Sequence, residues 1–220
     1  MAFAVYIRKS RSFRTIRLER GNDMGSKLKK KKKPMQPLGY EQDKLLSHVE
    51  IVRRTKVAKK SFSKTFKAAQ LINFCVMYDN FDFERRKMTN FQNKFLAHNE
   101  LLNGPKLIQE EKLIKQAIGF DCEKEAREFP LRPKMKICGI EKVKRLVDAE
   151  VSINNASDSL ESYLIIVIKT MRDNYRFSKK NIYLWWEKFK EVAQLYADGM
   201  TDEFVINYVQ ETLEWELKKI

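Results

Sequence analysis

Apolar residues recur every three or four positions along most of the chain after residue 40, which is the spacing of amphipathic helices. Glycine or proline stands where several of these stretches end, as at Gly104-Pro105. The chain holds only 7 Gly and 5 Pro, too few for a β-sandwich built on tight turns. The pattern predicts helical segments over 40–67, 68–78, 85–103, 107–118, 141–171, 178–197 and 201–217.

One segment of the chain, here called the phrase, occurs twice in similar form. Residues 79–95 read DNFDFERRKMTNFQNKF, and residues 173–189 read DNYRFSKKNIYLWWEKF. Asp-Asn, the second aromatic residue and the closing Lys-Phe are identical, and the basic pairs keep their chemistry. An apolar run precedes each copy, and a glycine and a terminal helix follow it. The order predicts two related helical units.

The predicted fold class is therefore all-α, with two related three-helix units in tandem, preceded by a basic flexible N-terminal arm. The arm covers 1–39 and the first unit 40–119. Residues 120–140 form a connector whose prolines and glycine bar a long helix, and the second unit covers 141–220.

The kept positions of the repeat predict packing and turn roles. In the second copy an apolar face of helical spacing is formed by Ile182, Trp185, Trp186, Phe189, Val192, Ala193 and Tyr196. The first copy has His98 at one of these positions, which predicts a half-buried histidine beside the core. The paired aromatic residues of each phrase are expected to pin the loop onto the preceding helix, with Asp82 and Ser178 capping the next one.

Charge separates the chain into two parts. The net charge of +15 lies entirely in residues 1–67, which hold 20 Lys/Arg and 5 Asp/Glu, while residues 68–220 hold 24 of each. Concentrated positive charge most often meets a polyanion. The lysine run in 27–39 leaves three interpretations open, namely a solvated tail, a nucleic-acid contact arm and a membrane-surface patch. Residues 1–23, with arginine at every third position from Arg8 to Arg20, also fit an organelle transit peptide.

The candidate nucleic-acid-binding residues follow from this charge. They are Lys29, Lys30, Lys31, Lys32, Lys33, Arg53, Arg54, Lys56, Lys59, Lys60 and Lys64. Secondary candidates are the basic pairs that open the helix after each phrase, because cations there oppose the helix dipole and call for another explanation. These are Arg85, Arg86, Lys179 and Lys180.

Catalytic and metal chemistry find little support. Asp79, Asp82 and Glu84 resemble an acidic metal cluster, but the second copy has Arg176 and Ser178 at the last two positions. No catalytic residue, metal site or cofactor is predicted, and the chain is not expected to be an enzyme. Three scattered cysteines fit a reducing cytoplasm, and no apolar run reaches membrane-spanning length.

A segment of the second copy resembles one found in small uncharacterised helical proteins of bacteriophages and prophages of Gram-positive bacteria. Its residues are Asp173, Tyr175, Phe177, Lys179, Lys180 and Ile182, followed by a long helix, a glycine and a closing acidic helix. That pattern runs roughly D-x-F-G-F-G-x-K/R-R-hydrophobic, and this chain lacks both glycines. The likeness covers 163–217 and the internal copy 69–119. It implies a phage or mobile-element origin and an all-helical module, with no activity to transfer.

Two function classes remain. The first is a non-enzymatic accessory protein that binds nucleic acid or a nucleoprotein through the basic first third. The alternative is an inhibitor or adaptor that binds a host nucleoprotein or defence complex through exposed aromatic residues, with Trp185, Trp186 and Trp215 as candidates.

Overall fold

The computed structural model describes residues 48–140 and 145–213, and within these ranges it contains helices and no strand. In chain order the helices are α1 (His48–Phe81), α2 (Arg85–Leu101), α3 (Pro105–Ile118), α4 (Cys122–Glu128), α5 (Leu131–Cys138), α6 (Leu146–Tyr175), α7 (Lys179–Asp198) and α8 (Asp202–Leu213). The predicted all-α class is confirmed for this part of the chain. The predicted arm, residues 1–39, lies outside it.

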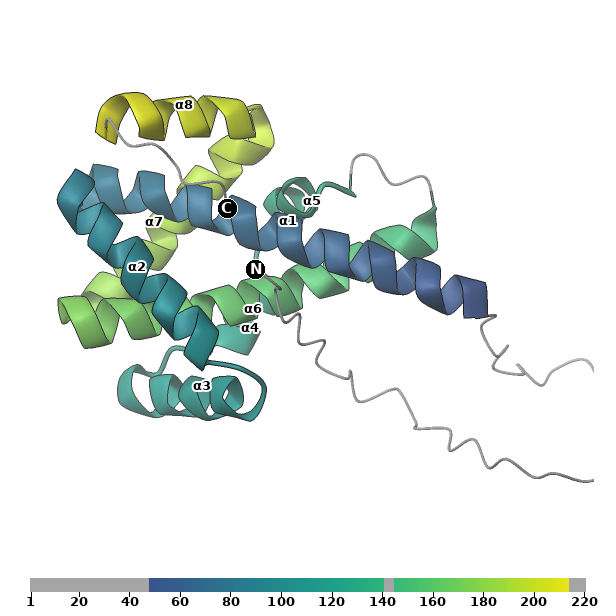
Figure 1. Cartoon of the computed structure of the whole chain (residues 1–220), viewed down its shortest axis with the longest axis horizontal. Coiled ribbons are helices and arrows are strands. Elements are labelled where there is room, and N and C mark those ends of the chain that lie inside the picture. Colours follow the sequence, from purple (N-terminus) through teal and green to yellow (C-terminus); the bar gives the residue numbers. More distant parts are fainter. Residues whose placement is uncertain (1–47, 141–144, 214–220) are drawn as a thin grey trace, which may run out of the picture.

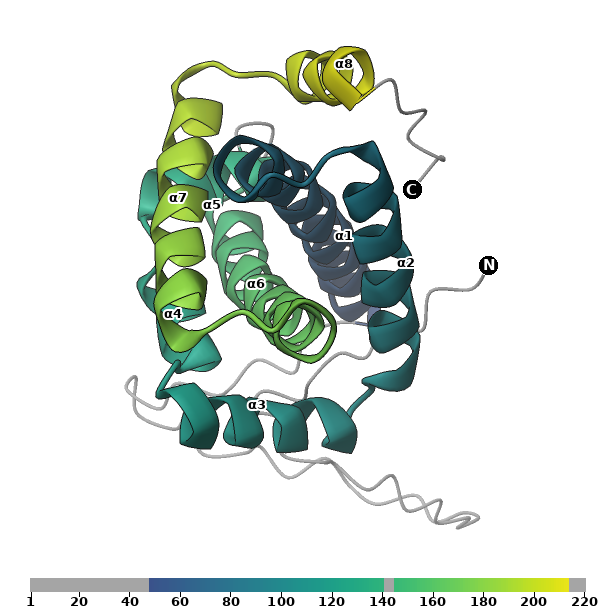
Figure 2. The same ribbon diagram turned by 90° about the vertical axis from the view of Figure 1, so that its left-hand side faces the viewer.

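Two long helices, α1 and α6, form the centre of the molecule (Figure 1) and make the most extensive contact among the described helices. The helix that follows each of them packs chiefly on the other one, so α7 lies against α1 and α2 against α6. The third helices follow the same exchange, with α8 on α1 and α3 on α6. Figure 2 shows the result, with α2 and α7 on opposite flanks of the central pair and α3 and α8 at opposite ends. Helices α2 and α3 are therefore held mainly by α6, and α7 and α8 are held by α1.

One large hydrophobic cluster runs through both halves and takes in the connector. It contains the predicted faces of α2 and α7, and Trp185, Trp186 and Phe189 are almost wholly buried there. The connector adds Cys122 and Ala126 of α4, Ile137 of α5, and Phe120 and Phe129 on either side of α4. Phe129 lies 5.5 Å from the ring of Trp186, between ring centroids. Burial of these large rings supplies most of the driving force for assembling the helices.

The boundary expected between 40–67 and a second helix at 68–78 does not exist. Residues 48–81 form one continuous helix, because no glycine or proline interrupts this range and its apolar positions keep helical spacing throughout. The solvated first half and the buried second half of α1 are thus one rigid element.

The turns after α1 and α6 have the same geometry, 94 positions apart. Asp82 and Arg176 both adopt the left-handed conformation, with φ of 53° and 54°. In each turn the next residue donates its backbone N–H to a methionine carbonyl, from Phe83 to Met77 (3.2 Å) and from Phe177 to Met171 (3.1 Å). These bonds satisfy carbonyls that the ends of both helices would otherwise leave unpaired.

The predicted cap at Asp82 is wrong, because this residue forms the left-handed turn and Glu84 occupies the N-cap position of α2 without a side-chain bond. The prediction holds for Ser178, whose hydroxyl oxygen accepts the backbone N–H of Asn181 at 3.3 Å.

The aromatic residues of the two phrases pack on each other. Ring centroids lie 5.1 Å apart for Phe81 and Phe177, and 5.0 Å apart for Phe83 and Tyr175. The rings of Phe83 and Phe177 also meet edge to face at 6.3 Å. The expectation that each pair only pins its own loop to the preceding helix was therefore incomplete. The two turns join the ends of α1 and α6.

The left-handed turn at Arg176 leads to a prediction about stability. A residue with a Cβ pays about 1–2 kcal/mol for this conformation, and glycine does not, although glycine loses more entropy on folding. We expect Arg176→Gly to raise the free energy of unfolding by about 0.5–1 kcal/mol and the Tm by roughly 1–4 °C. Arg176→Ala keeps the Cβ and serves as the control in the same thermal melts. Equal Tm values for the two variants would contradict the strain argument.

Candidate functional site

The solvent face of α1 carries a patch of lysines, here called the lysine face, formed by Lys56, Lys59, Lys60 and Lys67. All four side chains are exposed. Lys59 and Lys67 lie on one ridge of the helix with the exposed Ser63 between them, and Lys56 and Lys60 lie on the next ridge. At about 1.5 Å per residue the lysine face extends about 16 Å along the helix.

No acidic side chain of α1 neutralises this face. The helix has no Asp or Glu between Glu50 and Asp79. Lys56, Lys59 and Lys60 form no ion pair with any residue that the structure describes. Ammonium groups in this state keep their hydration and stay available to an external anion.

Arg53 and Arg54, predicted to belong to the same surface, are used within the protein. Arg53 pairs with Asp148 of α6 and with Glu50, whose carboxylate lies 2.6 Å from the guanidinium, and Arg54 pairs with Glu50 at 3.1 Å. Hydrogen bonds from both arginines lower the pKa of Glu50 to about 2. Arg53 therefore joins the beginnings of α1 and α6, and Arg54 pairs within α1.

The remaining candidates are scattered. Lys64 is half-buried, and its ammonium lies over Gly139, the left-handed residue that ends α5. Its charge there suits the carbonyl end of that helix. Lys29–Lys33 lie outside the described residues. The structure thus brings together Lys56, Lys59 and Lys60 from the predicted set, and it adds Lys67.

The secondary candidates open α2 and α7, as the sequence predicts. Arg85, Arg86, Lys179 and Lys180 are all exposed. Lys179 lies 5.8 Å from the centroid of the Tyr183 ring, within reach of a cation–π contact. Since α2 and α7 run on opposite flanks of the molecule, the two pairs do not extend the lysine face.

The lysine face has no counterpart on α6. The turns align α1 and α6 at an offset of 94 residues, which pairs the four lysines with Glu150, Ile153, Asn154 and Glu161. On α6 this surface is partly covered, because the buried Lys134 of α5 donates to Ser157 Oγ at 3.1 Å, and Glu161 is buried. On α1 the equivalent Ser63 and Lys67 are exposed. The requirements of packing, which both helices share, do not account for the lysines.

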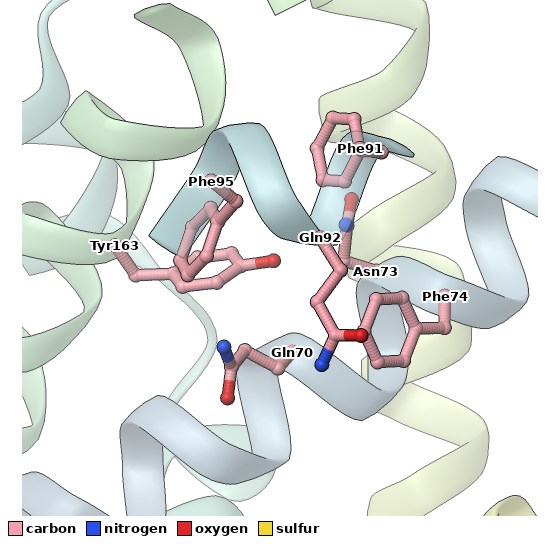
Figure 3. Close-up of a pocket in the computed structure, with 7 residues that line it drawn as sticks. All are labelled: Gln70, Asn73, Phe74, Phe91, Gln92, Phe95 and Tyr163. Carbon is pink, nitrogen blue, oxygen red and sulfur yellow. The ribbon is translucent and has the colours of Figure 1, made fainter. Parts of the chain in front are cut away.

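A small cavity lies between α1, α2 and α6 (Figure 3). It is lined by Gln70, Asn73, Phe74, Phe91, Gln92, Phe95 and Tyr163 and leaves a volume of about 10 Å³ for a water-sized probe. Gln70 Oε1 is buried there without a hydrogen-bond partner. At the offset of 94 residues, Gln92 corresponds to the larger Trp186. The cavity has room for about one water molecule and none for a metabolite.

A polar cluster joins α2, α3 and α6 around His98. Lys169 pairs with Glu110 at 3.0 Å and with Asp173 at 2.8 Å. The side-chain amide nitrogen of Asn174 lies 3.2 Å from His98 Nε2, and His98 Nδ1 is buried without a hydrogen-bond partner. Burial, followed by the charge of Lys169, lowers the pKa of His98. The half-buried position predicted for this residue is confirmed.

This cluster leads to a prediction about pH. The unfolded chain protonates His98 near pH 6.5, whereas the folded protein does so at a lower pH. Since the unfolded state binds the proton more readily, the stability that His98 contributes is present above about pH 6.5 and is lost as the pH falls towards the folded pKa. Urea denaturation between about pH 7 and pH 5 should show a smaller loss of stability for His98→Gln than for the parent chain. Identical pH profiles would contradict this role.

The aromatic residues proposed to bind a protein partner are not exposed. Trp185 and Trp186 have 0% and 1% of their surface accessible. Trp185 Nε1 donates to Asn73 Oδ1 at 2.8 Å, and Trp186 Nε1 donates to a Glu125 carboxylate oxygen at 2.6 Å. Trp215 lies outside the described residues. Trp185 and Trp186 therefore do not support the alternative function, in which exposed aromatic residues bind a host nucleoprotein or defence complex.

The part of the chain that the structure describes has neither a metal-binding cluster nor a membrane-spanning helix. Residues 48–140 and 145–213 contain no group of three or more His, Cys, Asp or Glu side chains placed to hold a metal ion. In the same ranges no helix combines the length and the apolar character needed to span a bilayer.

No protein-family model matches the chain, and no curated protein or solved structure matches it either.

Proposed function

We propose that this protein binds nucleic acid, alone or in a nucleoprotein, without being an enzyme, and that the lysine face of α1 is the ordered part of its binding surface. The observation that carries the proposal is the exposure of Lys56, Lys59, Lys60 and Lys67 on one face of a continuous helix. Four ammonium groups over about 16 Å match a chain of phosphates, which lysine binds as a point charge.

The difference between α1 and α6 supports the same function. Residues that form the core or the turns are similar in α1 and α6. The four lysines of α1, in contrast, correspond to acidic, polar or apolar residues of α6. A cluster of positive charge that the packing of the helices does not require is typical of a surface that binds an anion. The predicted contact run, Lys29–Lys33, precedes α1 in the chain and would extend the basic surface.

The wider organisation belongs to the proposal too. Residues 40–119 and 141–220 are two related three-helix units, which the matched turns and the exchanged packing of α2, α3, α7 and α8 support. The proposed basic N-terminal arm, residues 1–39, precedes the first unit. The resemblance of 163–217 to phage and prophage proteins supports an accessory role in a phage or mobile element.

The test is a salt titration of the full chain with a labelled 20-nucleotide oligonucleotide, read by fluorescence anisotropy. Four phosphate contacts on a single strand predict a slope of log K against log salt of about −3. The affinity then falls about 50-fold between roughly 50 and 200 mM salt. Contacts from the arm would make the slope steeper.

A second arm of the test uses vesicles that contain anionic lipid, because the lysine run also fits a membrane surface. Vesicle binding without oligonucleotide binding at about 50 mM salt would refute the proposal. So would oligonucleotide binding that does not change with salt.

A further inference from the structure

An aromatic ridge runs beside the lysine face. Phe62 and Phe66 are four residues apart on α1, both partly exposed, and their rings stack with an interplanar angle of 12° and centroids 6.3 Å apart. Phe66 also reaches the core, where its ring lies 5.5 Å from Tyr163 and 5.8 Å from Phe95. Phe62 belongs to neither of the hydrophobic clusters formed by the described residues. Packing therefore explains Phe66 and leaves Phe62 unexplained.

The equivalent positions on α6 show what a covered ridge looks like. At the offset of 94 residues, Phe62 and Phe66 correspond to Ala156 and Leu160, which are completely buried. The same two positions on α1 are larger, flat and accessible to solvent. The neighbouring ridge of the helix carries Lys59, Ser63 and Lys67, all of them exposed.

We infer that the lysine face binds single-stranded rather than double-stranded nucleic acid, with one base stacked on Phe62 and the adjoining phosphates on Lys59 and Lys60. This inference rests on the proposed function and specifies its partner. Aromatic rings next to a basic track are the usual means of holding a single strand, because every unpaired base offers a flat face. In a duplex the flat faces of the bases are stacked on each other, so they are not available to an aromatic ring.

The experiment compares the affinity of the full chain for oligo(dT) and oligo(rU) of 20 nucleotides with its affinity for a 20-base-pair duplex, at equal salt. Phe62→Ala removes the ring, and since Phe62 lies outside both hydrophobic clusters the fold should be retained, which circular dichroism verifies. We expect this variant to bind the single strands about 5- to 100-fold more weakly and the duplex within twofold of the parent chain. Phe62→Trp keeps a stacking ring and should retain the affinity for single strands, with its fluorescence quenched on binding. The DNA and RNA arms show which strand is preferred.

Several outcomes would overturn the inference. Unchanged affinity of Phe62→Ala for single strands, or an equal loss for strand and duplex, would leave nucleic-acid binding in place and remove the stacking role. No binding of either nucleic acid would remove the proposed function as well.

Discussion

Replacing Lys56, Lys59, Lys60 and Lys67 together by glutamine should weaken nucleic-acid binding by about two to three orders of magnitude at roughly 100 mM salt. Four phosphate contacts release close to three counterions. At about 100 mM salt, tenfold below 1 M, the release of these ions raises the binding constant by close to three powers of ten over its value at 1 M. Glutamine keeps the length and helix propensity of lysine, and all four positions are exposed, so the fold should persist. Fluorescence anisotropy with the labelled 20-nucleotide strand measures the change.

A matched variant removes the same charge elsewhere. Lys106, Lys112, Lys115 and Lys124 are exposed on α3 and α4, and their replacement by glutamine lowers the net charge equally. The exposed pair that Lys115 makes with Asp121 at 2.5 Å contributes little stability. We expect this control to bind within about fivefold of the parent chain, since only long-range attraction is lost. Equal losses in both variants would mean that net charge, not the lysine face, sets the affinity.

The largest effect on stability is expected at Trp185. Its side chain is completely buried between α1 and α7, and its indole N–H bonds Asn73 at 2.8 Å. Trp185→Ala leaves a cavity that costs about 3–5 kcal/mol, and it strands the buried Asn73. Since small proteins have about 5–15 kcal/mol in total, this variant should lose a large part of its stability.

Two further substitutions separate the free-energy cost of the cavity from that of the lost hydrogen bond. Trp185→Phe keeps most of the ring and removes the donor, so a loss of about 1–3 kcal/mol is expected. Leu184→Ala alters an exposed residue next to it on α7 and should change stability by less than about 1 kcal/mol. Urea denaturation followed by circular dichroism gives all three values. A cost below about 1 kcal/mol for Trp185→Ala would show that α7 is not docked on α1 as described.

The helices themselves could be predicted from the sequence because their signals are local. The apolar face of α7 and the cap at Ser178 follow from residues three or four positions apart. The error at Asp82 is also local, because aspartate suits both a cap and a left-handed turn, and the sequence does not say which. The missed continuity of α1 came from reading a change in composition as a boundary, although composition changes along a helix without breaking it.

Contacts between distant segments could not be predicted. The residues near Arg53 in the sequence do not indicate that it pairs with Asp148, 95 positions away. Because of this pair, Arg53 does not belong to the lysine face. The sequence shows two similar aromatic phrases, but not that their rings meet at the ends of α1 and α6. The lysine face was visible in part from the charge. Phe62 was overlooked because a lone aromatic residue at a helix edge resembles ordinary core until its exposure is known.

The most direct test of the lysine face is the difference in salt dependence between the parent chain and the variant with glutamine at 56, 59, 60 and 67. If these lysines contact phosphates of a single strand, the slope of log K against log salt should be smaller in magnitude by about 3 in the variant, and unchanged in the control on α3 and α4. Equal slopes for the parent chain and the lysine-face variant would show that these residues touch no phosphate, and the account of this surface would be wrong.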